Sequence, residues 1–282
     1  MSFIHNLQME HYEAVIDFQG LLRTGIWSFL TKCPNRIGFS LKEARHKLNC
    51  LFTNIHVSPE TSDLHIVQKN LSLLKPFEIF EHCAKSLAYV LDEVIYLKRD
   101  ELMRKNQLNK NDGLLGIHIG SSWRHSTKCW PTSFYSALLE KISPLKKTIL
   151  FWGPDEEKKI LEIPPLKNVI VTPKLSLLDL AAWIKACSLF VGSDSGPIHM
   201  AAALGIKTLS LMGPTLPQRL RPWGADHHFI YKDVDCSLCL KNICFKQHQC
   251  MKMITVDEVY YQIHKICNSL GLSSPSVSIG DQ

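Results

Sequence analysis

The sequence predicts an α/β fold built from parallel, doubly wound sheets, and two observations carry this prediction. Short apolar strands alternate with helical segments from Leu114 to Met212, which is typical of a parallel sheet with helices on both faces. The chain has 282 residues, of which 45% are hydrophobic and 21% charged, a globular composition long enough for one large or two medium domains. Ligands are expected at the carboxyl ends of the strands.

The part before this alternation contains one clear strand. Residues 12–18 form a short apolar run, which is followed by a turn at Gly20 and a helix over 21–30. Residues 65–74 and 77–91 carry apolar side chains at helical spacing. Because a doubly wound domain needs several strands, this part is expected to be incomplete.

Composition suggests the domain boundaries. The segment 101–113 is polar and rich in Lys and Asn, so it is expected to link a partial N-terminal domain (1–100) to a C-terminal domain (114–270). Residues 271–282 are rich in Ser, Pro and Gly and are expected to form a disordered tail.

The C-terminal domain has the regular alternation. Five strands are expected, at 114–119, 148–152, 169–171, 189–191 and 208–212. The expected helices are 132–142, a charged one from Asp155, 175–187, an Ala-rich one before the last strand, and a final amphipathic one at 256–270.

Charge and hydropathy exclude some classes of protein. The net charge is +6, but the basic residues are dispersed, without the clusters or aromatic interleaving of a nucleic-acid binder. This excess fits an anionic membrane surface, a phosphorylated substrate or a solubilising surface. The sequence has no apolar run of roughly 20 residues, and its start does not resemble a signal peptide, so a cytoplasmic location is expected.

The most informative turn joins a strand to a helix. The run Leu189–Val191 ends in Gly-Ser-Asp-Ser-Gly, and an Ala-rich helix follows with Pro197 in its first turn, where the missing N–H of proline costs nothing. Free N–H groups at such a helix start bind anions. Asp194 lies just before this helix start and His199 lies just after it. Helix capping explains the serines, but it does not require Asp, Gly and His together.

These residues give the chain a resemblance to glycosyltransferase family 9, which is best represented by the lipopolysaccharide heptosyltransferases. The resemblance includes Tyr12–Gly20 (YEAVIDFQG), Leu21–Thr24, Asn35–Gly38 and Thr208–Thr215, a strand that ends in Gly-Pro-Thr. It implies a GT-B type fold of two Rossmann-like domains. The first domain is expected to be incomplete, because the family's opening strand–helix units do not precede Tyr12.

The resemblance also implies a site for a nucleotide sugar. Ser121, Ser122 and Lys128 match family positions at the diphosphate, and two hydroxyls with a cation suit that role. A solvent-exposed loop lysine is the alternative for Lys128. Asp155 or Glu156 matches an acidic residue near the nucleotide, although carboxylates at a helix start also cap the helix.

Further along the chain, Leu175 matches the family segment that lines the base of the nucleotide. A position in the hydrophobic core is the alternative for Leu175. The resemblance assigns Asp194 to the sugar hydroxyls and the helix start at Ser195 and Gly196 to the leaving diphosphate. It assigns His199 to orienting the diphosphate or the turn. No metal or other cofactor is implied, because these groups and Lys128 supply the positive charge.

The implied reaction is an inverting transfer of heptose from ADP-heptose to the inner core of lipopolysaccharide. The protein would then work in the cytoplasm, with peripheral contact to the inner membrane. A family 9 transferase for another nucleotide sugar and an impaired sugar-nucleotide-binding remnant remain alternatives. The family's catalytic base, an Asp in a Gly-Asp loop, has no counterpart before Tyr12. Asp17 is a candidate substitute, with a strand-end hydrogen-bonding role as its alternative.

Four cysteines form a second constellation near the end of the chain. Cys236, Cys239, Cys244 and Cys250 are closely spaced, with His248 among them. Such clustering in a cytosolic chain is typical of a metal site, but the spacing differs from common zinc knuckles. Structural zinc, reduced thiols, and an iron–sulfur cluster or disulfide all remain open.

Overall fold

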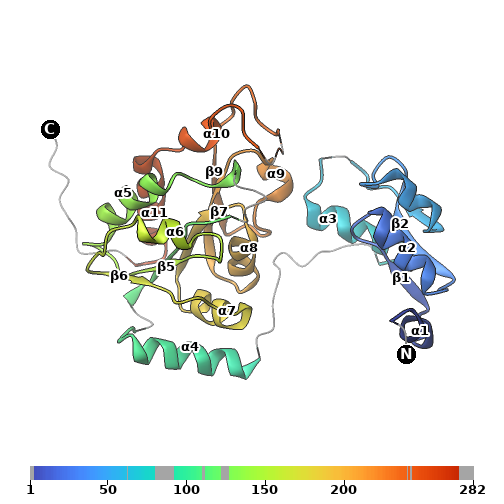
Figure 1. Ribbon diagram of the computed structural model, residues 1–282, viewed down its shortest axis with the longest axis horizontal. Coiled ribbons are helices and arrows are strands. Elements are labelled where there is room, and N and C mark those ends of the chain that lie inside the picture. Colours follow the sequence, from blue (N-terminus) through green and yellow to red (C-terminus); the bar gives the residue numbers. More distant parts are fainter. Residues whose placement is uncertain are drawn as a thin grey trace. The chain divides into compact units, whose positions relative to one another are not determined.

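The computed structural model describes residues 3–61, 63–79, 92–109, 112–121, 127–239, 241 and 243–272. The chain divides into two compact units, Met1–Cys83 and Ala84–Gln282. Figure 1 shows both units and labels most of their helices and strands.

Unit 1 contains a small parallel sheet. Its strands lie in the order β1 (Ala14–Ile16), β2 (Asn35–Phe39), β3 (Ile55–Val57). The other elements are α1 (Phe3–Met9), α2 (Leu22–Leu30), α3 (Ile66–Leu71) and the short 3-10 helices η1 (Lys47–Leu51) and η2 (Ser72–Phe77). A small core of Ile37, Phe39, Val57 and Leu73 holds the sheet to η2.

The expectation of one strand in this part was wrong, because β2 and β3 accompany β1. β2 begins with Asn and Arg and buries only its second half, and β3 has three residues with an exposed His in the middle. Neither strand presents the apolar run by which a strand is recognised in a sequence. Residues 80–91, which belong to the expected helix 77–91, lie outside the described residues.

Unit 2 is built on a six-stranded parallel sheet with the strand order β6-β5-β4-β7-β8-β9. The strands are β4 (Leu115–His118), β5 (Thr148–Phe151), β6 (Val169–Val171), β7 (Leu189–Ser193), β8 (Lys207–Met212) and β9 (His227–Tyr231). The helices are α4 (Glu93–Lys105), α5 (Thr132–Ile142), α6 (Glu157–Leu161), α7 (Leu177–Lys185), α8 (Gly196–Ala203), α9 (Pro217–Leu220), α10 (Gln249–Lys252) and α11 (Val256–Ser269).

Two hydrophobic clusters cover the two faces of this sheet. Along β7, Leu189 and Val191 belong to the cluster with α5 and α11, whereas Phe190 between them belongs to the cluster with α4, α7 and α8. Side chains alternate between faces along a strand, so a strand that is buried on both faces is apolar throughout. This explains why β4, β5, β7 and β8 are evident in the sequence.

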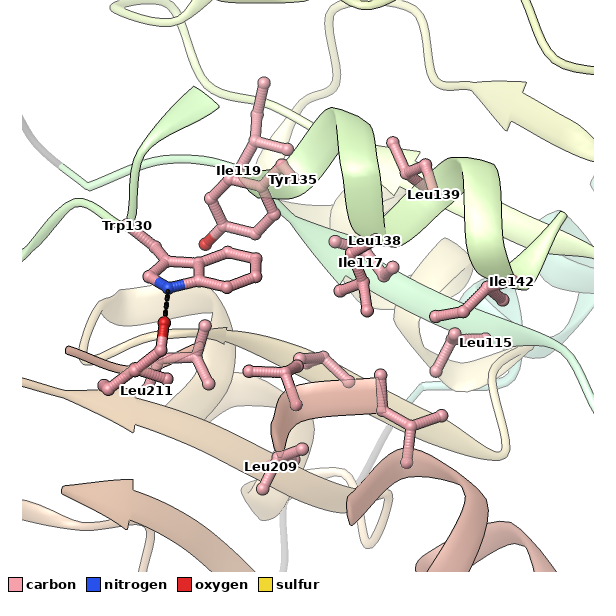
Figure 2. Close-up of a cluster of buried hydrophobic side chains, with 14 of the residues drawn as sticks. Leu115, Ile117, Ile119, Trp130, Tyr135, Leu138, Leu139, Ile142, Leu209 and Leu211 are labelled. Carbon is pink, nitrogen blue, oxygen red and sulfur yellow. Dashed lines mark hydrogen bonds between the residues drawn. The ribbon is translucent and has the colours of Figure 1, made fainter. Parts of the chain in front are cut away.

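Figure 2 shows the first cluster, in which α5 packs its apolar side onto β4. Trp130 lies at the start of this helix, and its indole N–H donates to the Ile254 carbonyl at 2.9 Å. Trp130 also makes an edge-on contact with Tyr135. These contacts hold the segment before α5, which carries Lys128, onto the sheet.

Helix α4 differs from the linker expected over residues 101–113. It ends at Lys105 and packs against α7 (Figure 1), with Ile95 and Met103 buried in the second cluster. An ion pair of 2.6 Å joins Lys98 to Asp179. Residues 101–113 look like a linker in the sequence because most of them are polar. No helix among the described residues is both long and apolar enough to cross a membrane.

Candidate functional site

The candidate residues of unit 2 gather where β4 and β7 end. These strands are neighbours, yet the chain runs from β4 outward to β5 and β6 on one side and from β7 outward to β8 and β9 on the other. The direction of winding thus reverses between β4 and β7. A crevice forms at such a point, outside the carboxyl ends of the strands.

Asp194, directly after β7, is the centre of a buried polar cluster. Its Oδ2 accepts hydrogen bonds from Lys128 Nζ at 2.7 Å and from Thr215 Oγ1 at 3.0 Å. Its Oδ1 lies 3.1 Å from Nε2 of His199 on α8. The Asp194 side chain is 7% exposed, and that of Lys128 is 20% exposed. The carboxylate is therefore held by donors from three different segments.

These partners keep Asp194 ionised. Burial favours the protonated form, but the hydrogen bond from His199 and the charge of Lys128 outweigh it and lower the pKa of Asp194 to about 2. A buried carboxylate with such partners is a fixed hydrogen-bond acceptor at neutral pH.

A cavity of about 400 Å³ opens beside this cluster. Its lining residues come from the ends of β4, β5 and β7 and from the segment before α7; they include His118, Ser121, Trp152, Glu156, Leu175 and Ser195. The Trp152 indole N–H donates to the Thr172 carbonyl at 2.6 Å, which fixes the ring. The cavity combines apolar walls with a few polar groups, as small-molecule sites do.

Glu156 is the buried acid of the cavity, 3% exposed. The Gly153 backbone N–H donates to its Oε2 at 2.9 Å, whereas Oε1 has no partner among the described residues. Burial is the main cause of its raised pKa. The carboxyl group lies so close to the backbone that a Cβ added at Gly120 would stand 2.2 Å from Glu156 Cδ. Glycine at position 120 thus makes room for this acid.

The start of α8 offers unpaired backbone donors to the same cavity. Ser195 occupies the N-cap position with an extended backbone, but its side chain makes no capping hydrogen bond. Its buried Oγ has no partner among the described residues. First-turn N–H groups have no acceptor within a helix. A Cβ at Gly196 would meet nothing within 4 Å. The arrangement suits an anion.

The structure brings nearly all of the sequence-predicted residues together. Six of them line the cavity: Ser121, Asp155, Glu156, Leu175, Ser195 and Gly196. Three more, Lys128, Asp194 and His199, form the adjoining polar cluster. Ser122 lies outside the described residues. The binding roles of these residues stay predictions.

Three residues of the site were missed, and one of them, Trp152, lines the cavity directly after β5. Thr215 was quoted only as the end of the Gly-Pro-Thr turn, yet it is 1% exposed and bonded to Asp194. His118 lines the cavity as the last residue of β4. Burial lowers the pKa of His118 to about 4, so it is neutral at pH 7. The signal for His118 was a polar side chain at the end of an apolar strand, whereas Thr215 lies three residues beyond the end of β8.

Asp17, the candidate base of unit 1, is fully engaged in hydrogen bonds. Its Oδ1 accepts from the backbone N–H groups of Gln19 and Gly20, at 2.9 and 3.1 Å. Its Oδ2 accepts from Thr24 Oγ1 at 2.7 Å and from Asn49 Nδ2 at 2.6 Å. This buried carboxylate ties β1 to α2 and η1, as the strand-end hydrogen-bonding alternative describes, and its role as a base stays a prediction.

The four clustered cysteines are free thiols. In the described part of the chain, no group of three or more His, Cys, Asp or Glu side chains is arranged to hold a metal ion. Cys250 is buried on α10 beneath Gly213, whereas the other three lie half-buried in the preceding segment. Burial raises the pKa of the Cys250 thiol, and the nearby thiol of Cys236 adds to the shift.

Comparison with known proteins identifies the family. The model of the family described as glycosyltransferase family 9 (heptosyltransferase) matches residues 1–249. The chain belongs to glycosyltransferase family 9. The resemblance seen in the sequence is thereby confirmed.

Two relatives of this family 9 chain are lipopolysaccharide heptosyltransferases. Lipopolysaccharide heptosyltransferase 1 of Campylobacter coli is 31% identical over 218 residues, which are 73% of this chain and 62% of that protein. The protein of the same name from Pseudomonas aeruginosa is 30% identical over 253 residues, which are 87% of this chain and 66% of that protein. The chain therefore spans less than two thirds of the length of either relative.

Solved structures show the same fold. A family 9 glycosyltransferase from Veillonella parvula matches with a TM-score of 0.75 at 21% identity, covering 95% of this chain and 77% of that chain. The ADP-heptose heptosyltransferase II of E. coli matches with a TM-score of 0.74 at 17% identity, covering 95% and 80%. The fold is thus the GT-B type α/β fold with Rossmann-like units.

Proposed function

We propose that this protein is an inverting glycosyltransferase that moves heptose from ADP-heptose to the inner core of lipopolysaccharide. The observation that carries the proposal is the polar cluster around Asp194, which lies beside a cavity at the strand ends of unit 2. The family and the heptosyltransferases among its relatives support this choice of sugar.

The cavity fits the nucleoside of such a donor. Trp152 and Leu175 offer apolar surface to a flat base, and the carboxyl group of Glu156 in the cavity wall is the candidate acceptor for ribose hydroxyls. A solved E. coli heptosyltransferase contains ADP, which agrees with a nucleotide in this role.

The diphosphate belongs between the start of α8 and Lys128. The oxygen of the acceptor hydroxyl attacks the anomeric carbon and its proton passes to solvent water. The bond from that carbon to the phosphate oxygen breaks, and the nucleoside diphosphate leaves with the electron pair. The transition state resembles an oxocarbenium ion, as in glycoside hydrolysis. The N–H groups at Ser195 and Gly196 and the ammonium of Lys128 stabilise the charge that develops on the leaving group.

Asp194 and His199 complete the sugar side of the site. The carboxylate of Asp194 accepts hydrogen bonds from sugar hydroxyls, and His199 on its other oxygen fixes its orientation. The acceptor in this proposal is carried by a lipid. Cytoplasmic location with peripheral contact at the inner face of the inner membrane is therefore part of the proposal.

A calorimetric screen of ADP, ADP-heptose, UDP and GDP tests the proposal. We expect ADP and ADP-heptose to bind and UDP and GDP to bind more weakly. Lys128→Ala should weaken ADP binding by roughly 1.5–3 kcal/mol, the value of a charge-assisted hydrogen bond. Lys158→Ala, at an exposed position, is the matched control and should leave the affinity unchanged.

The outcomes separate the alternatives. A preference for another nucleotide would indicate a different nucleotide sugar. Donor binding without transfer to a lipopolysaccharide core acceptor would indicate a binding protein. Equal ADP affinity in the Lys128→Ala variant and the wild type would remove the diphosphate role of Lys128.

A further inference from the structure

Ser176 belongs both to the wall of the donor cavity and to the start of a helix. Lys174, Leu175 and Ser176 follow β6 in the chain, and all three line the cavity. Ser176 is also the N-cap of α7, where its Oγ accepts a hydrogen bond from the Asp179 backbone N–H at 3.2 Å. An N-cap residue has a defined, non-helical backbone conformation, and that of Ser176 is extended. Whatever holds this cap therefore also holds the cavity wall.

The side chain of Asp179 strengthens this cap. The Ser176 hydroxyl donates to Asp179 Oδ2 at 2.6 Å, in addition to accepting from the Asp179 backbone N–H. A serine hydroxyl can rotate, and two hydrogen bonds with the same residue hold it in one orientation. Asp179 lies in the first turn of α7, where the helix dipole favours a negative charge. The position of this carboxylate thus determines how firmly Ser176 is held.

Lys98 holds the other oxygen of this carboxylate from a distant part of the chain. Its Nζ donates to Asp179 Oδ1 at 2.6 Å, and it comes from α4, which lies alongside α7 in Figure 1. The hydrogen bond from Lys98 is the main cause of the lowered pKa of Asp179, so the carboxylate is ionised at neutral pH. Ile95 and Met103 bury α4 in the hydrophobic cluster that it shares with α7. The backbone that carries Lys98 is therefore anchored.

We propose that Lys98 is a positioning residue of the donor site, which acts through Asp179 and Ser176 on the wall that receives the base. The ion pair is partly exposed, with 40% of the Lys98 side chain and 35% of the Asp179 side chain accessible, so its effect is modest. The competing role is an ion pair that only joins α4 to α7. The proposal deepens the proposed function and rests on it, because the base is placed against Leu175 there.

Calorimetry of the full chain with ADP and with inorganic pyrophosphate separates the two roles. ADP carries a base and a diphosphate, whereas pyrophosphate lacks the base. Lys98→Met should weaken ADP binding about twofold to fivefold, the range of a partly exposed ion pair, and leave pyrophosphate binding unchanged. Lys98→Arg keeps the cation and should retain most of the ADP affinity. The matched control is Lys105→Met, at an exposed position on the same helix. Equal losses for both ligands would contradict the positioning role.

A double-mutant cycle tests the route through Asp179. Asp179→Asn removes the charge that Lys98 contacts. If Lys98 acts through this carboxylate, the double variant should lose no more ADP affinity than Asp179→Asn alone, because residues in one network are not additive. Additive losses would show that Lys98 acts by another route and would overturn the proposal.

Hydrogen exchange of the ligand-free chain tests the positioning without ADP. In Lys98→Met the backbone N–H groups of residues 175–180 should exchange faster than in the wild type, while those of β7 should not change. Unchanged exchange at residues 175–180, or the same increase in Lys105→Met, would overturn the proposal. Absence of ADP binding by the wild type would overturn the proposed function, and the exchange measurement then decides whether Lys98 holds the segment. Normal ADP affinity in Lys98→Met would overturn the positioning role alone.

Discussion

The orientation of the Asp194 carboxylate is fixed by three hydrogen-bond partners: a lysine, a threonine and a histidine. Lys128 and Thr215 share Oδ2, and His199 contacts Oδ1. In the proposed complex Lys128 turns toward the diphosphate, whereas Thr215 is buried and comes from the turn after β8. Thr215 therefore keeps a hydrogen bond on Asp194 when Lys128 is drawn to the ligand.

The role of Thr215 predicts a difference between two substitutions. Thr215→Val keeps the shape but removes the donor, so ADP affinity should fall about tenfold, in line with roughly 1.5 kcal/mol for a hydrogen bond to a charged group. Thr215→Ser keeps a hydroxyl and should restore most of the affinity. Calorimetry measures the ADP affinity of both variants. Equal affinities would show that the Thr215 hydroxyl contributes nothing to ADP binding.

The low pKa of Asp194 predicts a contribution to stability that is lost in acid. Its pKa lies at about 2 in the fold against an ordinary value of 3.8, so the unfolded chain binds the proton more readily. The stabilisation is present above pH 4 and disappears as the pH falls from about 4 to about 2; linkage gives it a size of about 2 kcal/mol. Asp194→Asn should remove this pH-dependent part. Urea unfolding from pH 5 downward checks it, and parallel pH profiles of variant and wild type would contradict it.

At the scale of elements, the sequence was most informative where strands are buried on both faces. The strands β4, β5, β7 and β8 appear as apolar runs because both faces of the sheet are covered. β9 has two exposed residues and two histidines among its five residues, so its pattern is mixed, and it was not expected. The site followed this logic in part. Ser121 and Asp194, which come after the evident strands β4 and β7, were named, whereas His118 within the end of β4 and Thr215 in its motif were not given a role.

The turn after β4 illustrates a feature that no sequence pattern predicts. Gly120 is required by the close approach of Glu156, a contact that depends on the packing of β5 beside β4. Gly120→Ala should force the Glu156 carboxyl group to move, at a cost of about 1–3 kcal/mol in the free energy of unfolding. Gly196→Ala is the matched control, because its Cβ enters empty space and should leave the stability nearly unchanged. Urea unfolding of both variants decides, and similar losses in both would contradict the packing argument.

At the scale of the whole molecule, the two units carry different parts of the account. Unit 1 has a sheet of three strands and a buried Asp17 that ties β1 to α2 and η1. Every described candidate for donor binding belongs to unit 2, the larger of the two. Its sheet places the polar cluster, the cavity and the start of α8 at the ends of neighbouring strands.

The central claim is that unit 2 binds a nucleoside diphosphate at the carboxyl ends of β4, β5 and β7. A crystal structure of the full chain with ADP tests it most directly. The account predicts the base between Trp152 and Leu175, a ribose hydroxyl on Glu156, and the diphosphate at the start of α8 within reach of Lys128. A nucleotide bound elsewhere, or a cavity that stays empty at a saturating ADP concentration, would contradict it.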